Sequence, residues 1–369
     1  MRFVKIIRRI KLVNLVALFA SLAIVTCVFQ TPMRAYSLLL TNSMETITNN
    51  TNNTGDTNTA VNFVVPPKYI DAKVFSEGLA PVKIGNLWGY IDTNGNLLIK
   101  PQYNFANNFN EGLANVQIGL SKSGYINKSG QFIIQSRFDY GGKFDQGIAV
   151  VSTEGKYGYI DRNGNYVIPP QFDKSKNFSQ GLAVVKTGDK YGYIDEKGKF
   201  IIQAKFEYAS DFSEDLAFVM INNKYGYINK SGKVVIPLKY GAAFSFSHGL
   251  AVVKIDEKYS YINKSGKVVI LPQFNFAFPF VGELARVQIG KRWGYINTSG
   301  NLLIQTQFDD AKDFFQGLAA VRVGNAWGYI DKSGRFVIKP QFDEAGNFSN
   351  KVATVRIKGK VGLISSPLE

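Results

Sequence analysis

The sequence repeats itself every 34 residues, and this period constrains the fold more than any other feature. A Gly-Tyr-Ile step preceded by an aromatic residue marks each full copy. Full marks stand at Trp88–Ile91, Tyr157–Ile160, Tyr191–Ile194, Tyr225–Ile228, Trp293–Ile296 and Trp327–Ile330, and altered marks at Ser123–Ile126, Tyr259–Ile262 and Val361–Ile364. Self-similarity at such a period is typical of repeat architectures, in which each unit buries its faces against its neighbours. The sequence therefore predicts nine tandem units over residues 62–368.

Each unit reads as short strands separated by turns. In one copy the predicted strands are Leu182–Lys186, Lys190–Ile194 and Lys199–Ile202, all rich in β-branched and aromatic residues. A period of 34 residues also occurs in helical repeats, but runs of four to six apolar residues bounded by glycine do not have a helical period. We therefore expect three-stranded β units.

A glycine and a small polar residue define the turn after the second strand of each unit. The glycines are Gly95, Gly130, Gly164, Gly198, Gly232, Gly266, Gly300 and Gly334. Three residues earlier stand Asp92, Asn127, Asp161, Asp195, Asn229, Asn263, Asn297 and Asp331. Glycine adopts positive φ without steric cost, and Asp or Asn accepts hydrogen bonds from the turn. Because Asn replaces Asp freely, the pattern indicates a structural role and not general-base catalysis.

A second spacing links one unit to the next. It reads aromatic-x-x-small-x-x-Phe, as in Phe206, Ala209 and Phe212. Steps of three residues place side chains on one side of a helical turn. We expect a single turn of helix at this place in each unit.

The expected fold is all-β, with three-stranded units stacked in an open superhelical, solenoid-like array. A closed, propeller-like ring is the alternative. The chain opens on a segment that matches the third strand of later units and ends after a second strand. This arrangement is compatible with both architectures.

The N-terminus has the layout of an export signal. Basic residues precede an apolar run over residues 12–29, and Pro32 follows. Residues 1–35 are predicted to be a helical signal peptide or signal anchor, which places the rest of the chain on the exported side. Residues 36–61 are rich in Thr and Asn and read as a flexible linker. The single cysteine, Cys27, lies in the apolar run, so the repeats contain neither disulfides nor thiolate metal ligands.

The repeat mark, the Gly-Leu-Ala strand, the turn glycine and Pro-Gln-Phe-Asp together resemble the WG repeats, also called KWG repeats, of bacterial proteins. The resemblance covers roughly residues 62–368. Ser123, Ser260 and the last copy, Lys360–Ser365, depart from the pattern. The resemblance implies a β-repeat scaffold without shared catalytic residues.

Two repeated columns are candidate binding surfaces. One holds aromatic pairs on a strand face, and the other holds a cation just before the mark. The aromatic candidates are Trp88, Tyr90, Trp293, Tyr295, Trp327 and Tyr329, and the basic ones are Lys156, Lys190, Lys224 and Arg292. Aromatic pairs can hold sugars or quaternary ammonium groups, and spaced cations suit a polyanion or a lipid surface. Their structural alternatives are core stacking and protection of strand edges.

Nothing in the repeats indicates catalysis. His248 is the only histidine of the chain, so neither a catalytic triad nor a zinc site is expected. We expect a non-enzymatic interaction scaffold of the cell envelope, periplasmic or secreted, that uses no cofactor or metal. Its expected partners are proteins or envelope polymers, and the membrane if the N-terminal segment is retained, but not nucleic acid. The alternative is a module that binds glycans, cell wall or anionic polymers. The net charge of +15 suits anionic partners.

Overall fold

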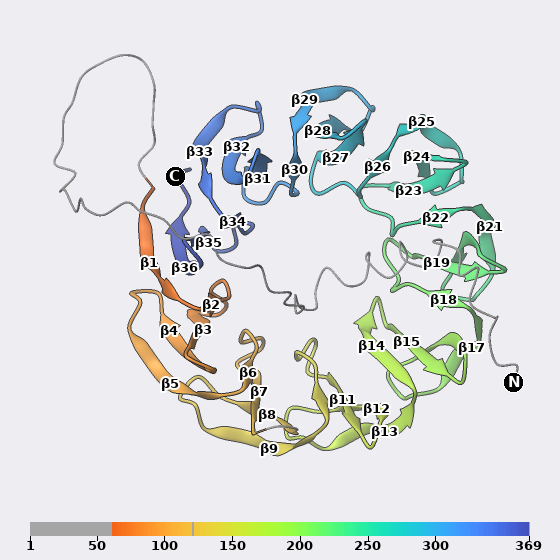
Figure 1. The fold of residues 1–369 in the computed structure, drawn as a ribbon. Coiled ribbons are helices and arrows are strands. Elements are labelled where there is room, and N and C mark those ends of the chain that lie inside the picture. The colour runs from red at the N-terminus through yellow and green to blue at the C-terminus, as the bar shows by residue number, and fades with distance from the viewer. Residues whose placement is uncertain (1–60, 120–121, 369) are drawn as a thin grey trace, which may run out of the picture. The chain divides into compact units, whose positions relative to one another are not determined.

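The computed structural model describes residues 61–119 and 122–368. Over these ranges the chain forms 36 β-strands, which hydrogen-bond into nine four-stranded sheets. The sheets follow one another around a ring like the blades of a propeller (Figure 1). We number the blades one to nine along the chain, beginning with the sheet β2–β5.

The two inner strands of each blade lie toward the centre of the ring. The innermost strands are β2 (Asp71–Ala72), β6 (Phe105–Ala106), β10 (Tyr140–Gly141), β14 (Lys174–Ser179), β18 (Tyr208–Ala209), β22 (Ala242–Ala243), β26 (Phe276–Ala277), β30 (Asp310–Ala311) and β34 (Glu344–Ala345). The second strands are β3 (Leu79–Ile84), β7 (Ala114–Ile118), β11 (Ala149–Thr153), β15 (Leu182–Thr187), β19 (Leu216–Ile221), β23 (Leu250–Ile255), β27 (Leu284–Ile289), β31 (Leu318–Val323) and β35 (Val352–Ile357).

The two outer strands complete each blade. The third strands carry the repeat mark and are β4 (Leu87–Asp92), β8 (Lys122–Ile126), β12 (Lys156–Ile160), β16 (Lys190–Ile194), β20 (Lys224–Asn229), β24 (Lys258–Asn263), β28 (Arg292–Asn297), β32 (Ala326–Asp331) and β36 (Lys360–Ser365). The outermost strands are β5 (Leu97–Tyr103), β9 (Phe132–Phe138), β13 (Tyr166–Phe172), β17 (Phe200–Phe206), β21 (Val234–Tyr240), β25 (Val268–Phe274), β29 (Leu302–Phe308), β33 (Phe336–Phe342) and β1 (Phe63–Tyr69).

The turn between the third and outermost strands has the predicted chemistry. Asp195 Oδ1 accepts hydrogen bonds from the backbone N–H groups of Lys197 at 3.0 Å and Lys199 at 2.9 Å. Gly198 has a φ of 80°, in the left-handed region. In another blade Asn229 Oδ1 makes the same contacts with the turn. The prediction of a structural role for this Asp or Asn is confirmed.

This equivalence predicts how the turn responds to substitution. Asp195→Asn should change the free energy of unfolding by less than about 0.5 kcal/mol, because the amide oxygen replaces the carboxylate oxygen. Asp195→Ala should lower it by about 1 kcal/mol, because two turn N–H groups lose their acceptor. Urea denaturation of both variants measures the difference. An Asn variant as unstable as the Ala variant would mean that the charge, and not the acceptor, matters.

The hydrophobic core lies between blades. Tyr193 and Ile202 of blade four pack against Ala209, Phe212 and Val219 of blade five, all of them buried. The same kinds of residue form a cluster at each of the other blade contacts. The small residue of the second spacing is Ala209 in this contact, and it is fully buried against the preceding blade. Each blade therefore buries both its faces only within the ring.

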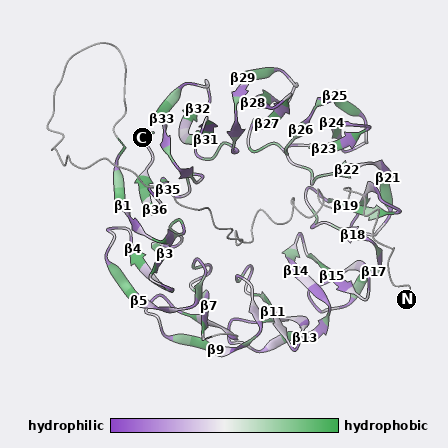
Figure 2. Ribbon diagram, in the orientation of Figure 1, coloured by the Kyte–Doolittle hydropathy of each residue, from purple (hydrophilic) through white to green (hydrophobic). Residues whose placement is uncertain are grey.

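The outermost strands present one edge to solvent. Figure 2 shows that their first residues are largely hydrophobic, as in β1 and β5. In β5 the side chain of Ile99 is buried toward blade two, whereas Leu98 is 57% exposed. Pro101 stands in the same strand, as Pro170 and Pro340 do in β13 and β33. Proline has no N–H to donate, so it protects an edge strand from pairing with another chain.

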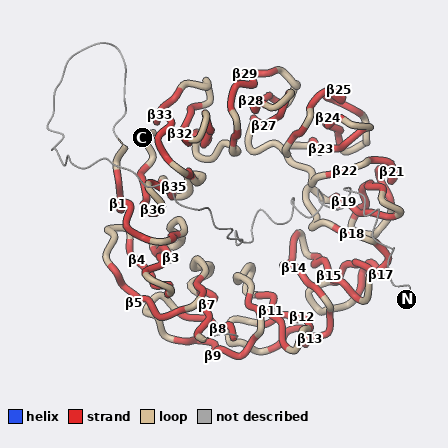
Figure 3. The backbone as a smooth tube through the Cα atoms, viewed as in Figure 1, coloured by secondary structure: helices blue, strands red, loops and turns tan. Residues whose placement is uncertain are grey.

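The predicted helical turn and the three-stranded unit are wrong. Figure 3 shows strands and loops but no helix within the described residues. Tyr208 and Ala209 form the extended strand β18, paired with Met220 and Val219 of β19. Phe206, at the start of the spacing, belongs to the outermost strand of the preceding blade. The spacing of three therefore joins two blades through a fourth, two-residue strand, and not through a helix.

The prediction of an open, solenoid-like array is also wrong, and the closed ring is the architecture observed. Strand β1 pairs antiparallel with β36, so the first strand of the repeats completes the last blade. Val65 and Tyr69 of β1 are buried at this closure. Pairing covers the edge of β36, which an open array would leave exposed to solvent.

The predicted signal segment, residues 1–35, lies outside the described residues. The predicted linker, residues 36–61, also lies outside them except for Val61. Within the described residues no helix is long and apolar enough to span a membrane.

Candidate functional site

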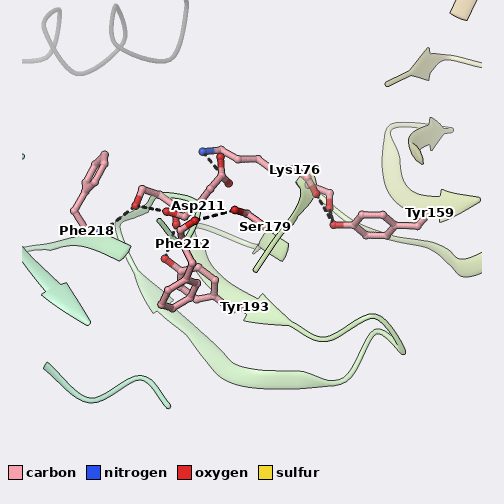
Figure 4. A network of polar contacts seen from close by, with 9 residues as sticks. Tyr159, Lys176, Ser179, Tyr193, Asp211, Phe212 and Phe218 are labelled. Atoms are coloured by element: carbon pink, nitrogen blue, oxygen red, sulfur yellow. Dashed lines mark hydrogen bonds and ion pairs between the residues drawn. The ribbon is translucent and has the colours of Figure 1, made fainter. Parts of the chain in front are cut away.

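The tyrosine of the repeat mark joins each blade to the next. Its hydroxyl donates a hydrogen bond to a backbone oxygen 17 residues later, on the inner segment of the following blade. The pairs are Tyr90 with Asn107, Tyr125 with Gly142, Tyr159 with Lys176, Tyr193 with Ser210, Tyr227 with Phe244, Tyr261 with Phe278, Tyr295 with Lys312 and Tyr329 with Gly346. Figure 4 shows two of these tyrosines. Burial raises the pKa of all eight tyrosines, which keeps their hydroxyls protonated as donors.

Removing one such hydroxyl should weaken the ring measurably. Tyr193→Phe keeps the buried ring but leaves the carbonyl of Ser210 without its donor, so stability should fall by about 1–3 kcal/mol. Tyr191→Phe in the same strand is the matched control, because no hydrogen bond to its hydroxyl is found within the described residues. It should cost less than about 0.5 kcal/mol. Thermal unfolding followed by circular dichroism compares them, and equal losses would contradict this role of the hydroxyl.

The aromatic candidates lie between blades. Tyr90, Tyr295 and Tyr329 are fully buried. Trp88 is also buried and packs in one cluster with Ala106 of the next blade. Trp327 is half-buried against the corresponding cluster. These contacts are those of the core-stacking alternative, and a role in ligand binding stays a prediction.

The other half-buried tryptophan, Trp293, lies beside a group of aromatic side chains at the inner end of blade seven. Its ring centroid is 5.8 Å from that of Phe278 and 6.2 Å from that of Phe276. The guanidinium of Arg286 lies 3.5 Å from the centroid of Phe278 and forms an ion pair of 2.8 Å with Asp313. Burial raises the pKa of Asp313, and Arg286 opposes that rise.

The basic candidates stand at the exposed start of the third strands. Three of them form ion pairs with the acidic residue that follows the outermost strand of the same blade. The pairs are Lys156 with Asp173 at 2.5 Å, Lys190 with Glu207 at 3.9 Å and Arg292 with Asp309 at 2.6 Å. For Lys224 no ion pair is found within the described residues. The hydrogen bond from Lys156 holds the pKa of Asp173 below its ordinary value, helped by the Gly188 N–H. These exposed pairs partly offset the positive column.

Sequence reasoning missed the residues that directly follow the small residue of each innermost strand. They occupy equivalent positions in the nine repeats, but their side chains differ in chemistry from blade to blade. They are Lys73, Asn107, Gly142, Lys176, Ser210, Phe244, Phe278, Lys312 and Gly346. In the sequence they could have been found as a position of varied chemistry directly after the small residue of the aromatic-x-x-small-x-x-Phe spacing. Burial lowers the pKa of Lys73 to about 8, although the nearby Asp71 opposes the shift.

Metal-ligating side chains are not grouped within residues 61–119 and 122–368. No group of three His, Cys, Asp or Glu side chains in these ranges could hold a metal ion. His248 is exposed in a turn with a φ of 53°, and its Nδ1 lies 3.0 Å from Ser247 Oγ. A cavity of about 190 Å³ lies where blades eight, nine and one meet, lined by Lys312, Trp327 and Glu344 among others.

Solved structures share the fold at low sequence identity. A structure described as a crystal structure of the eukaryotic initiation factor is 11% identical, with a TM-score of 0.57, over 82% of this chain and 92% of that chain. BamB from Moraxella catarrhalis is 10% identical, with a TM-score of 0.44, over 82% of this chain and 98% of that one. The first similarity concerns the fold alone. No curated protein matches the sequence.

The family comparison matches the chain nine times in tandem. The model of the WG containing repeat matches residues 58–88, 88–119, 124–157, 157–191, 191–225, 225–259, 259–293, 293–325 and 327–360. These matches span the nine blades and contain the tyrosines that join them. This chain therefore belongs to the family of proteins built from WG repeats.

Proposed function

We propose that this chain is a non-enzymatic interaction scaffold that works on the exported side of the cell envelope. One observation carries the proposal. The residues that the copies share build the ring, whereas the inner end of each blade carries residues that differ from copy to copy. A surface built this way holds varied side chains on a rigid frame, which suits recognition of a protein partner. The export signal predicted in residues 1–35 supports the location.

The inner end of blade seven is the best place to look for a partner. Phe276, Phe278 and Trp293 are half-buried there, and aromatic side chains are enriched at the centres of protein interfaces. A partner with exposed aliphatic side chains would cover these rings.

A photo-crosslinking experiment tests this function. A benzoylphenylalanine is placed at Phe278 of the full chain in its own cells, and in the control at Leu271, which is 72% exposed on the outermost strand of the preceding blade, blade six. We expect a discrete protein adduct from position 278 and none from position 271. The proposal fails if position 278 gives no adduct, or if both positions give the same adducts.

Location has a separate test. If the repeats are exported, protease added to intact spheroplasts should digest them, whereas a cytoplasmic marker should stay whole. Protection of the repeats until the membrane is lysed would contradict the envelope location.

The glycan or anionic-polymer module is the second candidate, favoured by the net charge of +15. Retention of the purified protein on peptidoglycan and on anionic lipid vesicles, in a series of salt concentrations, separates the two. If added salt abolishes retention, the basic residues of the third strands bind the ligand, because salt screens contacts between opposite charges. Salt-insensitive retention on peptidoglycan would indicate stacking of sugars on aromatic rings. No retention on either leaves the protein scaffold.

A further inference from the structure

The contact between blades nine and one departs from the pattern of the other eight. Val361 stands where full marks have Trp or Tyr, and Leu363 replaces the tyrosine that joins blades elsewhere. Gly346 lies on the adjoining inner segment. A cavity of about 190 Å³ opens here, with Val361 and Gly346 in its wall. We call it the seam cavity.

Lys312 in the wall of the seam cavity lacks the acceptor that equivalent lysines have. In blade one, Lys73 Nζ donates to Asn107 Oδ1 of the next blade at 2.8 Å. In blade four, Lys176 Nζ forms an ion pair of 3.6 Å with Asp211 of the next blade (Figure 4).

In blade eight the next blade offers Gly346 at the place of Asn107. No hydrogen bond or ion pair to Lys312 Nζ is found within residues 61–119 and 122–368. Asn347, at the place of Asp211, has a buried carboxamide oxygen that accepts no hydrogen bond there. The ammonium of Lys312 instead lies 5.3 Å from the ring centroid of Trp327. Burial lowers the pKa of Lys312, and the carboxylates of Asp310 and Glu344 oppose this shift. A half-buried ammonium without an acceptor is unfavourable, so an oxygen acceptor entering the cavity would be bound favourably.

The charges around the cavity are balanced. Lys312 and Arg356 supply two cations, and Asp71 and Glu344 supply two carboxylates. Arg356 is already engaged, because its Nε donates to Glu344 at 2.9 Å and its guanidinium also donates to the carbonyls of Ile70 and Gly359. The same contact engages Glu344, so Lys312 and Asp71 are the cation and the carboxylate left for an incoming ligand. A dianion would face two carboxylates, whereas a ligand with one charge of each sign would complement the wall.

We propose that the seam cavity binds a small zwitterion of the α-amino-acid class. The ligand carboxylate accepts hydrogen bonds from Lys312 beside the Trp327 ring, and its ammonium faces Asp71. This inference goes beyond the scaffold function, and it stands or fails independently of any protein partner.

Tryptophan fluorescence of the full chain can test the site. The chain has three tryptophans, and Trp88→Tyr with Trp293→Tyr leaves Trp327 as the reporter. Tyrosine already stands at these positions in four other copies, so the ring should tolerate both changes. We expect at least one of the twenty standard amino acids to give a saturable change below about 10 mM. Lys312→Met in this background should weaken its binding by about tenfold or more.

Matched controls make the outcome decisive. Lys176→Met removes the equivalent lysine of blade four and should leave the dissociation constant unchanged. Asp71→Asn should weaken the same amino acid but not its analogue that lacks the ammonium. Circular dichroism checks that each variant is folded.

The proposal is overturned if none of the twenty amino acids saturates the signal. It is also overturned if Lys312→Met binds as tightly as the parent, or if the carboxamide analogue of the best ligand binds equally well. Either of the last two results would show that a carboxylate at Lys312 does not hold the ligand.

Discussion

Gly192→Ala should destabilise the ring by about 3 kcal/mol or more, although it adds only one methyl group. A Cβ at Gly192 would lie 2.6 Å from the carbonyl oxygen of Ile202 and 2.7 Å from the nitrogen of Ala204. Both atoms belong to the backbone of β17, which bulges over the repeat mark where its register with β16 shifts. Backbone cannot move aside as a flexible side chain can. Relieving the steric clash would therefore break the pairing of the outermost strand β17 with β16.

The matched control is Gly188→Ala in the same blade. Gly188 has a φ of 59°, and nothing lies within 4 Å of a Cβ placed there. Gly188→Ala therefore introduces only the strain of an alanine in the left-handed backbone conformation, which costs about 1–2 kcal/mol. Thermal and urea unfolding of the two variants measure the difference. If Gly192→Ala is as stable as Gly188→Ala, the close approach of the β17 backbone is not the reason that glycine is needed at position 192.

Blade six shows how a larger residue can fit at the same place. Ser260 replaces the glycine of the repeat mark and is fully buried. Its Oγ donates a hydrogen bond to the carbonyl of Ile270 at 2.7 Å. The hydroxyl thereby turns part of the close approach into an attractive contact. Gly192→Ser should accordingly be less destabilising than Gly192→Ala, although serine is the larger residue.

The hairpins of the fold could be predicted because local residues determine them. Asp195 and Gly198 form a turn whose acceptor and positive φ are readable from residue type alone. The innermost strand could not be predicted, because two residues such as Tyr208 and Ala209 are too few to show an alternating pattern. Their pairing depends on β19, which the spacing of three residues does not reveal.

The candidate site was only partly readable. The aromatic and basic columns could be recognised because they repeat in the sequence. In the structure, however, the repeated residues mainly make contacts that hold the ring together. Tyr295 is buried beneath the next blade, and Arg292 forms an ion pair with Asp309. The seam cavity combines Val361, a departure from the repeat mark, with Lys312 and Gly346 at the position that varies from blade to blade. Their proximity depends on three neighbouring blades. The sequence of a single repeat cannot show which of its altered residues lie next to altered residues of other repeats in the folded ring.

Ring closure was undetermined for a physical reason. The segment that matches an outermost strand, Phe63–Tyr69, precedes the first complete blade, and the last copy ends without such a strand. An open array with a spare strand at one end has the same sequence as a ring closed by that strand. Only the pairing of β1 with β36 separates them, and it joins residues about three hundred positions apart.

A chain that begins at Ile70 and lacks β1 should therefore be much less stable than one that begins at Val61. Val65 and Tyr69 are 1% and 5% exposed, and losing their burial alone should cost about 3–6 kcal/mol. The loss also exposes Val361 and Leu363 and leaves the edge of β36 unpaired. Thermal unfolding of the two chains gives the comparison.

Adding the missing strand as a peptide separates closure from general damage. A peptide of residues 61–69 should restore much of the lost stability in a concentration-dependent way, because it binds only the folded ring. The same peptide with Val65→Asp should fail, since the carboxylate would be buried where Val65 packs. If the chain without β1 melts at the same temperature as the longer chain, closure contributes nothing. The blades would then be held by their neighbours alone, as in the open array that the pairing of β1 with β36 excludes.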